Sequence, residues 1–117
     1  MQKPEEKMKI SKELAKGSTG LLVLSVLAEE EMYGYQIIQV IEKRSESVFK
    51  LNEGTLYPIL HSLEKEGYLE SYRAQSESGR ERKYYKITPQ GRLRLKVQLE
   101  EWEAFSDAVS SIVKGKT

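Results

Sequence analysis

The chain contains no cysteine, which excludes disulfide bonds, thiolate nucleophiles and thiolate metal sites. Its single histidine, His61, has no second histidine or cysteine with which to share a metal ion. No apolar run approaches the roughly 18 residues that a membrane-spanning helix needs, and the N-terminus lacks the apolar region of a secretory signal. We therefore expect no metal, no cofactor and no membrane partner, and a cytoplasmic location.

Catalytic residues are also missing from the sequence. No serine lies in a nucleophile-elbow setting, and the acids near His61, Glu64 and Glu66, have the spacing of ordinary charges on a helix surface. With neither a nucleophile–base pair nor a metal set, we predict that the protein is not an enzyme. Any turnover by the isolated protein would contradict this prediction.

Charge is balanced overall but unevenly distributed. Nineteen basic and eighteen acidic residues give a net charge of +1 in a chain of 117 residues, a length that suits a single domain. Residues 80–96 contain only one acid, Glu81, among seven basic residues: Arg80, Arg82, Lys83, Lys86, Arg92, Arg94 and Lys96. Acids gather elsewhere, at residues 29–31 and in the last helix. A basic patch offset in this way indicates a nucleic-acid surface that the net charge conceals.

The spacing of apolar residues predicts four helices. The first spans Lys9–Glu31, and a short turn at Met32–Gly34 separates it from the second, at Tyr35–Arg44. The last helix spans Pro89–Val113, with Thr88 as its cap and Pro89 in the favoured first position.

The third helix has clear end signals and one awkward residue. Asn52 is a good N-cap, and Gly67 is a typical stop signal. Pro58 lacks an N–H group and clashes with a preceding turn unless it lies near a helix start. We therefore expect regular helix to begin near Thr55.

A β-hairpin should follow the third helix directly. Tyr68–Arg73 and Arg82–Thr88 have strand character, and the loop between them carries Gly79 and Arg80. A helix followed by a basic-tipped hairpin is typical of a winged helix-turn-helix domain. The predicted fold is therefore mainly α with a small β-hairpin, divided into a DNA-binding domain at residues 1–88 and a dimerisation helix at residues 89–117.

Two elements of this fold are candidate DNA contacts. The third helix would lie in the major groove, where Asn can pair with adenine, the Thr methyl can contact thymine, and Tyr and Lys suit phosphates. The hairpin tip projects beyond the helical body and can reach phosphates. The residues of the third helix that should face outward are Asn52, Glu53, Thr55, Tyr57, His61 and Ser62, with Lys50 just before them. The proposed DNA contacts are Lys50, Asn52, Thr55, Tyr57, His61, Arg80, Arg82 and Lys83. For Tyr57 and His61, packing against the hairpin is an alternative role.

The last helix carries an apolar stripe without an obvious partner in the chain. Its members, which we expect to form a homodimer interface, are Leu95, Leu99, Trp102, Phe105, Val109 and Ile112. If the two copies do not close fully, an aromatic-lined cavity at Leu99, Trp102 and Phe105 would suit a planar hydrophobic small molecule. A simple helix–helix contact is the alternative role of Trp102 and Phe105.

Four segments together resemble the PadR family of winged helix-turn-helix transcriptional regulators. The matching segments are YGYQI at Tyr33–Ile37, GTLYPIL at Gly54–Leu60, LEKEGYL at Leu63–Leu69 and GRERKYYKITPQG at Gly79–Gly91. They follow the order and spacing of the family across roughly residues 18–92. The resemblance also accounts for Pro58, which is similar to a feature of the family's recognition helix.

The resemblance implies a dimeric repressor that binds a palindromic operator of double-stranded DNA through its third helix and its wing. The single C-terminal helix resembles the short, LmrR-like subfamily, which implies multidrug sensing by planar drugs held between paired tryptophans. Trp102 lies at a similar place in the last helix. A competing hypothesis is a winged-helix protein–protein adaptor that does not bind DNA.

Overall fold

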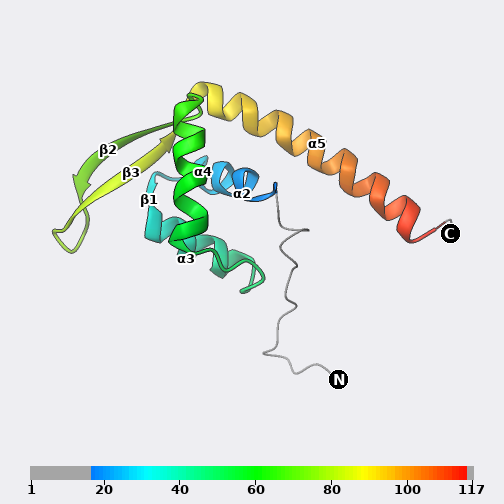
Figure 1. Ribbon diagram of the computed structural model, residues 1–117, viewed down its shortest axis with the longest axis horizontal. Helices are drawn as coiled ribbons and strands as arrows, with labels where there is room; N and C mark the ends of the chain where they lie inside the picture. The colour runs from blue at the N-terminus through cyan, green and yellow to red at the C-terminus, as the bar shows by residue number, and fades with distance from the viewer. Residues whose placement is uncertain (1–16, 116–117) are drawn as a thin grey trace, which may run out of the picture.

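The computed structural model describes residues 17–115, and in this range it contains four helices and a three-stranded antiparallel sheet (Figure 1). The helices are α2 (Thr19–Leu27), α3 (Gly34–Arg44), α4 (Glu53–Lys65) and α5 (Pro89–Val113). The strands are β1 (Met32–Tyr33), β2 (Leu69–Gln75) and β3 (Glu81–Ile87), in the spatial order β1-β3-β2. This arrangement confirms the predicted winged-helix fold class with a long C-terminal helix.

Two predictions near the N-terminus are wrong. The helix predicted for Lys9–Glu31 ends at Leu27, and in the turn that follows the N–H groups of Glu29 and Glu30 share the Val26 carbonyl. Its residues 9–16 lie outside the described range. The segment predicted as a turn, Met32–Gly34, instead contains strand β1, which pairs with Tyr85 and Tyr84 of β3, and Gly34 begins α3.

Helix α4 has the predicted cap and stop residues, but it begins earlier than expected. Asn52 is confirmed as its N-cap, with the side chain accepting a hydrogen bond from the Thr55 N–H. The helix starts at Glu53, not near Thr55, and contains Pro58. Pro58 removes the hydrogen bond that its N–H would have donated to the Gly54 carbonyl, yet the helix continues through it to Lys65. Gly67, with a φ of +86°, ends the helix as predicted.

The hydrophobic core lies where α2, α3 and α4 meet the inner face of the sheet. Its buried members are Val23, Leu24, Val26, Leu27, Met32, Ile37, Ile41, Leu56, Leu60, Leu69, Tyr85 and Ile87. Side chains alternate between the two faces of a strand, so Tyr85 and Ile87 point into this core while Arg82 and Tyr84 lie on the outer face. This alternation decides which residues of the hairpin are available to a partner.

Strands β2 and β3, with their connecting loop, form the wing (residues 69–87). Their register runs from Leu69 opposite Ile87 to Gln75 opposite Glu81. The hairpin prediction is confirmed, although β2 runs on to Gln75 and β3 begins at Glu81. The tip turns where the Gly79 N–H donates to the Ser76 carbonyl at 2.8 Å, and Gly79 has a φ of +85°. The wing projects away from the helices (Figure 1).

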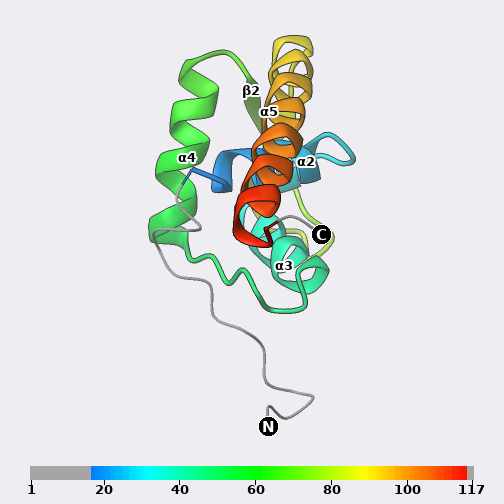
Figure 2. The same ribbon diagram turned by 90° about the vertical axis from the view of Figure 1, so that its right-hand side faces the viewer.

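Helix α5 begins at Pro89 and ends at Val113, as predicted. Its cap, Thr88, accepts a hydrogen bond from the Gly91 N–H at 3.0 Å and donates one to the Gly67 carbonyl at 2.6 Å. The start of α5 is thereby joined to the end of α4, and the rest of the helix extends away from the body (Figures 1 and 2). None of the helices in the described range is long and apolar enough to cross a membrane.

Candidate nucleic-acid interface

Helix α4 presents a polar, exposed face to solvent. Leu56 and Leu60 are buried in the core, and Ile59 and Leu63 are partly buried against it. All the residues predicted to face outward are exposed: Lys50, Asn52, Glu53, Thr55, Tyr57, His61 and Ser62. Burying this polar face against the rest of the described chain would give little hydrophobic stabilisation. Its side chains are exposed and therefore available to a polar partner.

Asn52 has a structural task at the start of this face. Its Oδ1 atom accepts a hydrogen bond from the Thr55 N–H at 2.9 Å. This bond satisfies one of the N–H groups that every helix leaves unpaired at its first turn. Two-bond pairing of Asn52 with an adenine would require both the amide oxygen and the amide nitrogen. The Nδ2 group is the atom left free to donate to a base.

Tyr57 contacts the start of α3. A Cβ atom placed on Gly34 would lie 2.7 Å from the Tyr57 hydroxyl oxygen, so the tyrosine ring occupies the space above this glycine. Tyr57 is nevertheless 39% exposed. The ring thus packs across the junction between α3 and α4 and still has an accessible surface at the α4 face.

Arg80 is the free cation at the wing tip. Its residue is exposed, and its side chain has no hydrogen bond or ion pair with any described residue. Nearby, Arg73 lies 3.6 Å from the Glu81 carboxylate in an exposed pair. Such surface pairs contribute little to stability. Arg80 can therefore engage a phosphate without first giving up an internal partner.

Arg82 does not extend from the tip in this way. Its guanidinium lies over the ring of Tyr33, 4.8 Å from the ring centroid, and its Nε atom is buried without a hydrogen-bond partner among the described residues. Tyr33 belongs to an outer-face tyrosine cluster, which consists of Tyr33, Tyr72 and Tyr84. The Tyr84 ring lies edge-on to Tyr33 at 5.4 Å and stacks on Tyr72 at 5.6 Å.

Sequence reasoning missed the role of Tyr33, because a two-residue strand has no detectable periodicity.

A second contact joins the tyrosine cluster to the residue before β1. The Tyr72 hydroxyl donates a hydrogen bond to the Glu31 carboxylate, and this bond raises the pKa of the Tyr72 phenol. The tyrosine cluster is therefore joined to the segment Glu31–Tyr33 through both Tyr72 and Tyr33.

Lys83 lies on the opposite, inner face of the wing. Its Nζ atom is 4.0 Å from a carboxylate oxygen of Glu64 in α4 and 5.5 Å from the centroid of the Tyr85 ring. Burial is the main cause that raises the pKa of the Tyr85 phenol. Of the three cations predicted to reach DNA from the wing, only the Arg80 side chain has no partner among residues 17–115, whereas Arg82 and Lys83 both contact other side chains.

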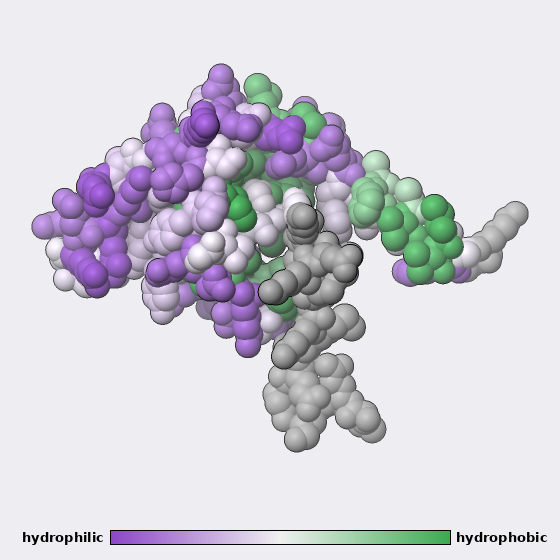
Figure 3. Space-filling view, in the orientation of Figure 1, coloured by the Kyte–Doolittle hydropathy of each residue, from purple (hydrophilic) through white to green (hydrophobic). Residues whose placement is uncertain are grey.

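The surface divides into two parts of different character. Figure 3 shows hydrophilic side chains over the wing and hydrophobic ones on the distal part of α5. The exposed apolar residues of α5 are Leu93, Val97, Leu99, Trp102, Phe105, Val109, Ile112 and Val113. Of the predicted dimer residues, only Leu95 is partly buried and packs on the core. The remaining five have no core to cover within the described chain.

The predicted ligand residues are only partly brought together in one copy of the chain. The Trp102 and Phe105 rings lie 6.4 Å apart, measured between centroids. An open hollow of about 360 Å³ lies beside Leu95 and Leu99, but Trp102 and Phe105 do not line it. In the described range, no three histidine or acidic side chains come together as they would in a metal site.

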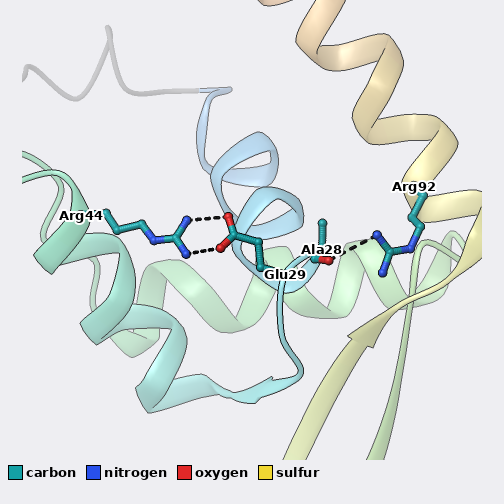
Figure 4. A network of polar contacts seen from close by, with 4 residues as sticks. All are labelled: Ala28, Glu29, Arg44 and Arg92. Atoms are coloured by element: carbon teal, nitrogen blue, oxygen red, sulfur yellow. Dashed lines mark hydrogen bonds and ion pairs between the residues drawn. The ribbon is translucent and has the colours of Figure 1, made fainter.

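A polar network joins α5 to α3 through the turn after α2. Figure 4 shows the Arg92 guanidinium donating a hydrogen bond to the Ala28 carbonyl, at 3.3 Å, and Arg44 of α3 forming two hydrogen bonds with the adjacent Glu29 carboxylate. Hydrogen bonding to Arg44 lowers the pKa of the Glu29 carboxyl. One short turn is thus held by both α5 and α3.

Comparison with known proteins places this arrangement in a family. Residues 23–97 match the model of the transcriptional regulator PadR-like family. A transcriptional regulator structure from Clostridium thermocellum has 36% identity and a TM-score of 0.81, and the match covers 89% of this chain and 98% of that one. A PadR-like regulator from Bacillus cereus has 30% identity and a TM-score of 0.79, with 90% and 100% covered.

A curated relative from Mycobacterium tuberculosis, also a transcriptional regulator, is 29% identical over 91% of this chain and 92% of its own length. These relatives are regulators of transcription and not enzymes, and regulators of this family bind DNA. With the exposed face of α4, the basic wing and the extended α5 in place, the chain belongs to the PadR-like family of DNA-binding transcriptional regulators.

Proposed function

We propose that the protein is a homodimeric repressor that binds a palindromic operator through α4 and the wing. The observation that carries this proposal is the unpaired Arg80 at the wing tip, together with the exposed polar face of α4. A wing cation supplies affinity through phosphates, while a helix in the major groove reads bases. Repression of transcription also implies that the protein works in the cytoplasm.

The proposed contacts divide by chemistry. On α4 and just before it, Lys50 and Tyr57 suit phosphates, Thr55 offers a methyl group to thymine, and His61 and the Nδ2 group of Asn52 can donate to base edges. On the wing, Arg80 is the cation best placed for a phosphate because it has no competing partner in the described chain. Lys83 would have to leave Glu64 before reaching DNA.

Residues 89–117 form the proposed dimerisation unit, and residues 1–88 the DNA-binding unit. The exposed apolar side chains of Leu99, Trp102, Phe105, Val109 and Ile112 support this division, because water would otherwise contact a continuous apolar stripe. Two-fold assembly through the stripe would place two copies of α4 on one duplex, and a two-fold protein matches a palindromic site.

The interface is also the proposed place for an inducer. Two copies of Trp102 and Phe105 facing one another would present flat apolar surfaces, and a planar hydrophobic molecule between them would be held by stacking. Such a ligand would release the operator only if it bound the dimer more tightly in a conformation that does not fit DNA.

The experiment that tests the proposal is selection of binding sites from randomised DNA, followed by gel-shift titration. We expect the recovered sites to be palindromic and to recur upstream of a regulated gene. Arg80→Ala should weaken binding to the recovered site, whereas Lys114→Ala, which removes an equal charge from an exposed residue directly after α5, should not. Recovery of no preferred DNA, with no salt-dependent binding to the upstream region, would instead support the protein–protein adaptor.

A further inference from the structure

Arg82 lies where a wing cation would be expected to reach DNA, yet its side chain is held against the sheet. Tyr33 pairs with Tyr84 in the register of β1 and β3, so Arg82 is its diagonal neighbour on the same face. The guanidinium stacks on the Tyr33 ring at 4.8 Å, and the Nε atom is buried. A stacked guanidinium of this kind is attracted by the negative face of the ring.

The partner of Arg82 is joined to the rest of the DNA-facing surface. Tyr33 is the N-cap residue of α3, and its backbone N–H donates to the Gln36 side chain at 3.1 Å. The next residue, Gly34, lies under the Tyr57 ring of α4. One two-residue segment, Tyr33–Gly34, therefore contacts the wing on one side and the recognition helix on the other.

We propose that Arg82 is a positioning residue, which fixes the angle of the wing relative to α4 by stacking on Tyr33 and does not itself bind a phosphate. The inference rests on the proposed function, since it concerns how α4 and the wing engage one operator together. In this arrangement Arg80 neutralises a phosphate, and Arg82 determines where Arg80 is placed. The two arginines then make different contributions to binding that a salt titration separates.

The test measures operator affinity as a function of salt for Arg82→Gln and for Arg80→Gln as the matched control. Each lost phosphate contact makes the plot of log affinity against log salt less steep by about 0.9, so loss of one contact in each of the two wings of the dimer makes it less steep by about 1.8. We expect this change in slope for Arg80→Gln. For Arg82→Gln we expect about a tenfold loss of affinity at every salt concentration, a loss of the size that a partly desolvated cation–π contact can cause, with the slope of the unmodified protein.

Substitutions of Tyr33 test whether its ring is the stacking partner of Arg82. Tyr33→Phe keeps the ring and should bind like the unmodified protein, whereas Tyr33→Leu should reproduce the affinity loss of Arg82→Gln. Because the two side chains act together, the double variant should be no weaker than the weaker single variant. Arg82→Lys, which keeps a cation over the ring, should restore most of the affinity. Thermal unfolding confirms that each variant is folded, and if Tyr33→Leu is not, the slope of Arg82→Gln decides alone.

Three results would overturn the inference: a slope change for Arg82→Gln equal to that of Arg80→Gln, unchanged affinity for Arg82→Gln, or fully additive losses in the double variant. If the proposed DNA-binding function is wrong, the result differs from all three, because the unmodified protein would then show no salt-dependent binding to any selected site. If that binding is present and Arg80→Gln flattens it, any of the three results refutes only the role assigned to Arg82.

Discussion

Gly91 lies directly against the backbone of Tyr68. A Cβ atom on Gly91 would stand 2.2 Å from the Tyr68 carbonyl oxygen and 2.7 Å from Cγ1 of Ile87. No side chain fits between these atoms, so the first turn of α5 is pressed onto the connection between α4 and β2. This close approach, with the hydrogen bonds of Thr88 to Gly67 and Gly91, determines the direction in which α5 leaves the body.

Gly91→Ala should therefore be strongly destabilising. The added methyl group meets backbone, which cannot move aside as a flexible side chain can, so we expect the free energy of unfolding to fall by about 3 kcal/mol. Urea unfolding at one fixed protein concentration measures this. Gly20→Ala is the control, because Gly20 lies in α2 with nothing within 4 Å of the added atom. Equal stabilities of the two variants would contradict the close packing at Gly91.

Asn52→Ser should separate capping from base recognition. Serine is as good an N-cap as asparagine, so the stability should be retained, whereas Asn52→Ala should lose about 1 kcal/mol. Serine lacks the Nδ2 donor, and a lost base contact costs on the order of 1–3 kcal/mol at one base pair. Gel-shift titration on operators altered at single positions checks this. Binding by Asn52→Ser equal to that of the unmodified protein would limit Asn52 to its capping role.

Val109→Asp should dissociate the proposed dimer. Val109 is 41% exposed in one copy and lies on the apolar stripe of α5, and burying an unpaired carboxylate in an interface is costly. Light scattering during gel filtration should give the mass of one chain for Val109→Asp. Ser111→Asp adds the same charge on the opposite side of the helix and should leave the dimer intact. Dimers of equal stability in both variants would exclude the stripe as the interface.

Planar hydrophobic dyes should quench the fluorescence of Trp102, the single tryptophan of the chain, and lower operator affinity. Stacking between paired aromatic side chains is the physical reason for both effects. Fluorescence titration is compared with gel shifts at the same dye concentrations. Quenching without a change in DNA affinity would mean that the dye binds near Trp102 but does not regulate DNA binding. Trp102→Ala adds a further distinction, because loss of the dimer in this variant would indicate that the ring is mainly a scaffold.

Local signals made most of the fold predictable. Asn52, Gly67 and Thr88 act on the backbone within a few residues of themselves; Asn52 is the predicted cap, and Gly67 and Thr88 mark helix ends where the sequence indicated. The long stripe of α5 was predictable for the same reason, since helical periodicity is a local property. Pro58 misled the prediction of the α4 start, because the helix runs through the proline from Glu53 to Lys65.

Long-range contacts were not predictable in this way. Strand β1 is two residues long and exists only because Met32 and Tyr33 pair with distant residues of β3. The same distance hid the stacking of Arg82 on Tyr33 and the bond from Arg92 to the Ala28 carbonyl. A cation in a basic segment has the same local pattern whether it faces DNA or an aromatic ring, so sequence alone grouped Arg82 with Arg80.

The most direct test of the account is the salt dependence of operator binding by the unmodified protein and by Arg80→Ala. Lysine and arginine contacts to phosphates release counterions, so log affinity should fall linearly with log salt, with a slope of about −0.9 for each phosphate neutralised. We predict a steep slope for the unmodified dimer and one shallower by about 1.8 for Arg80→Ala, because a dimer carries two wings. Affinity that does not change with salt, or identical slopes for the two proteins, would contradict the claim that the wing holds DNA.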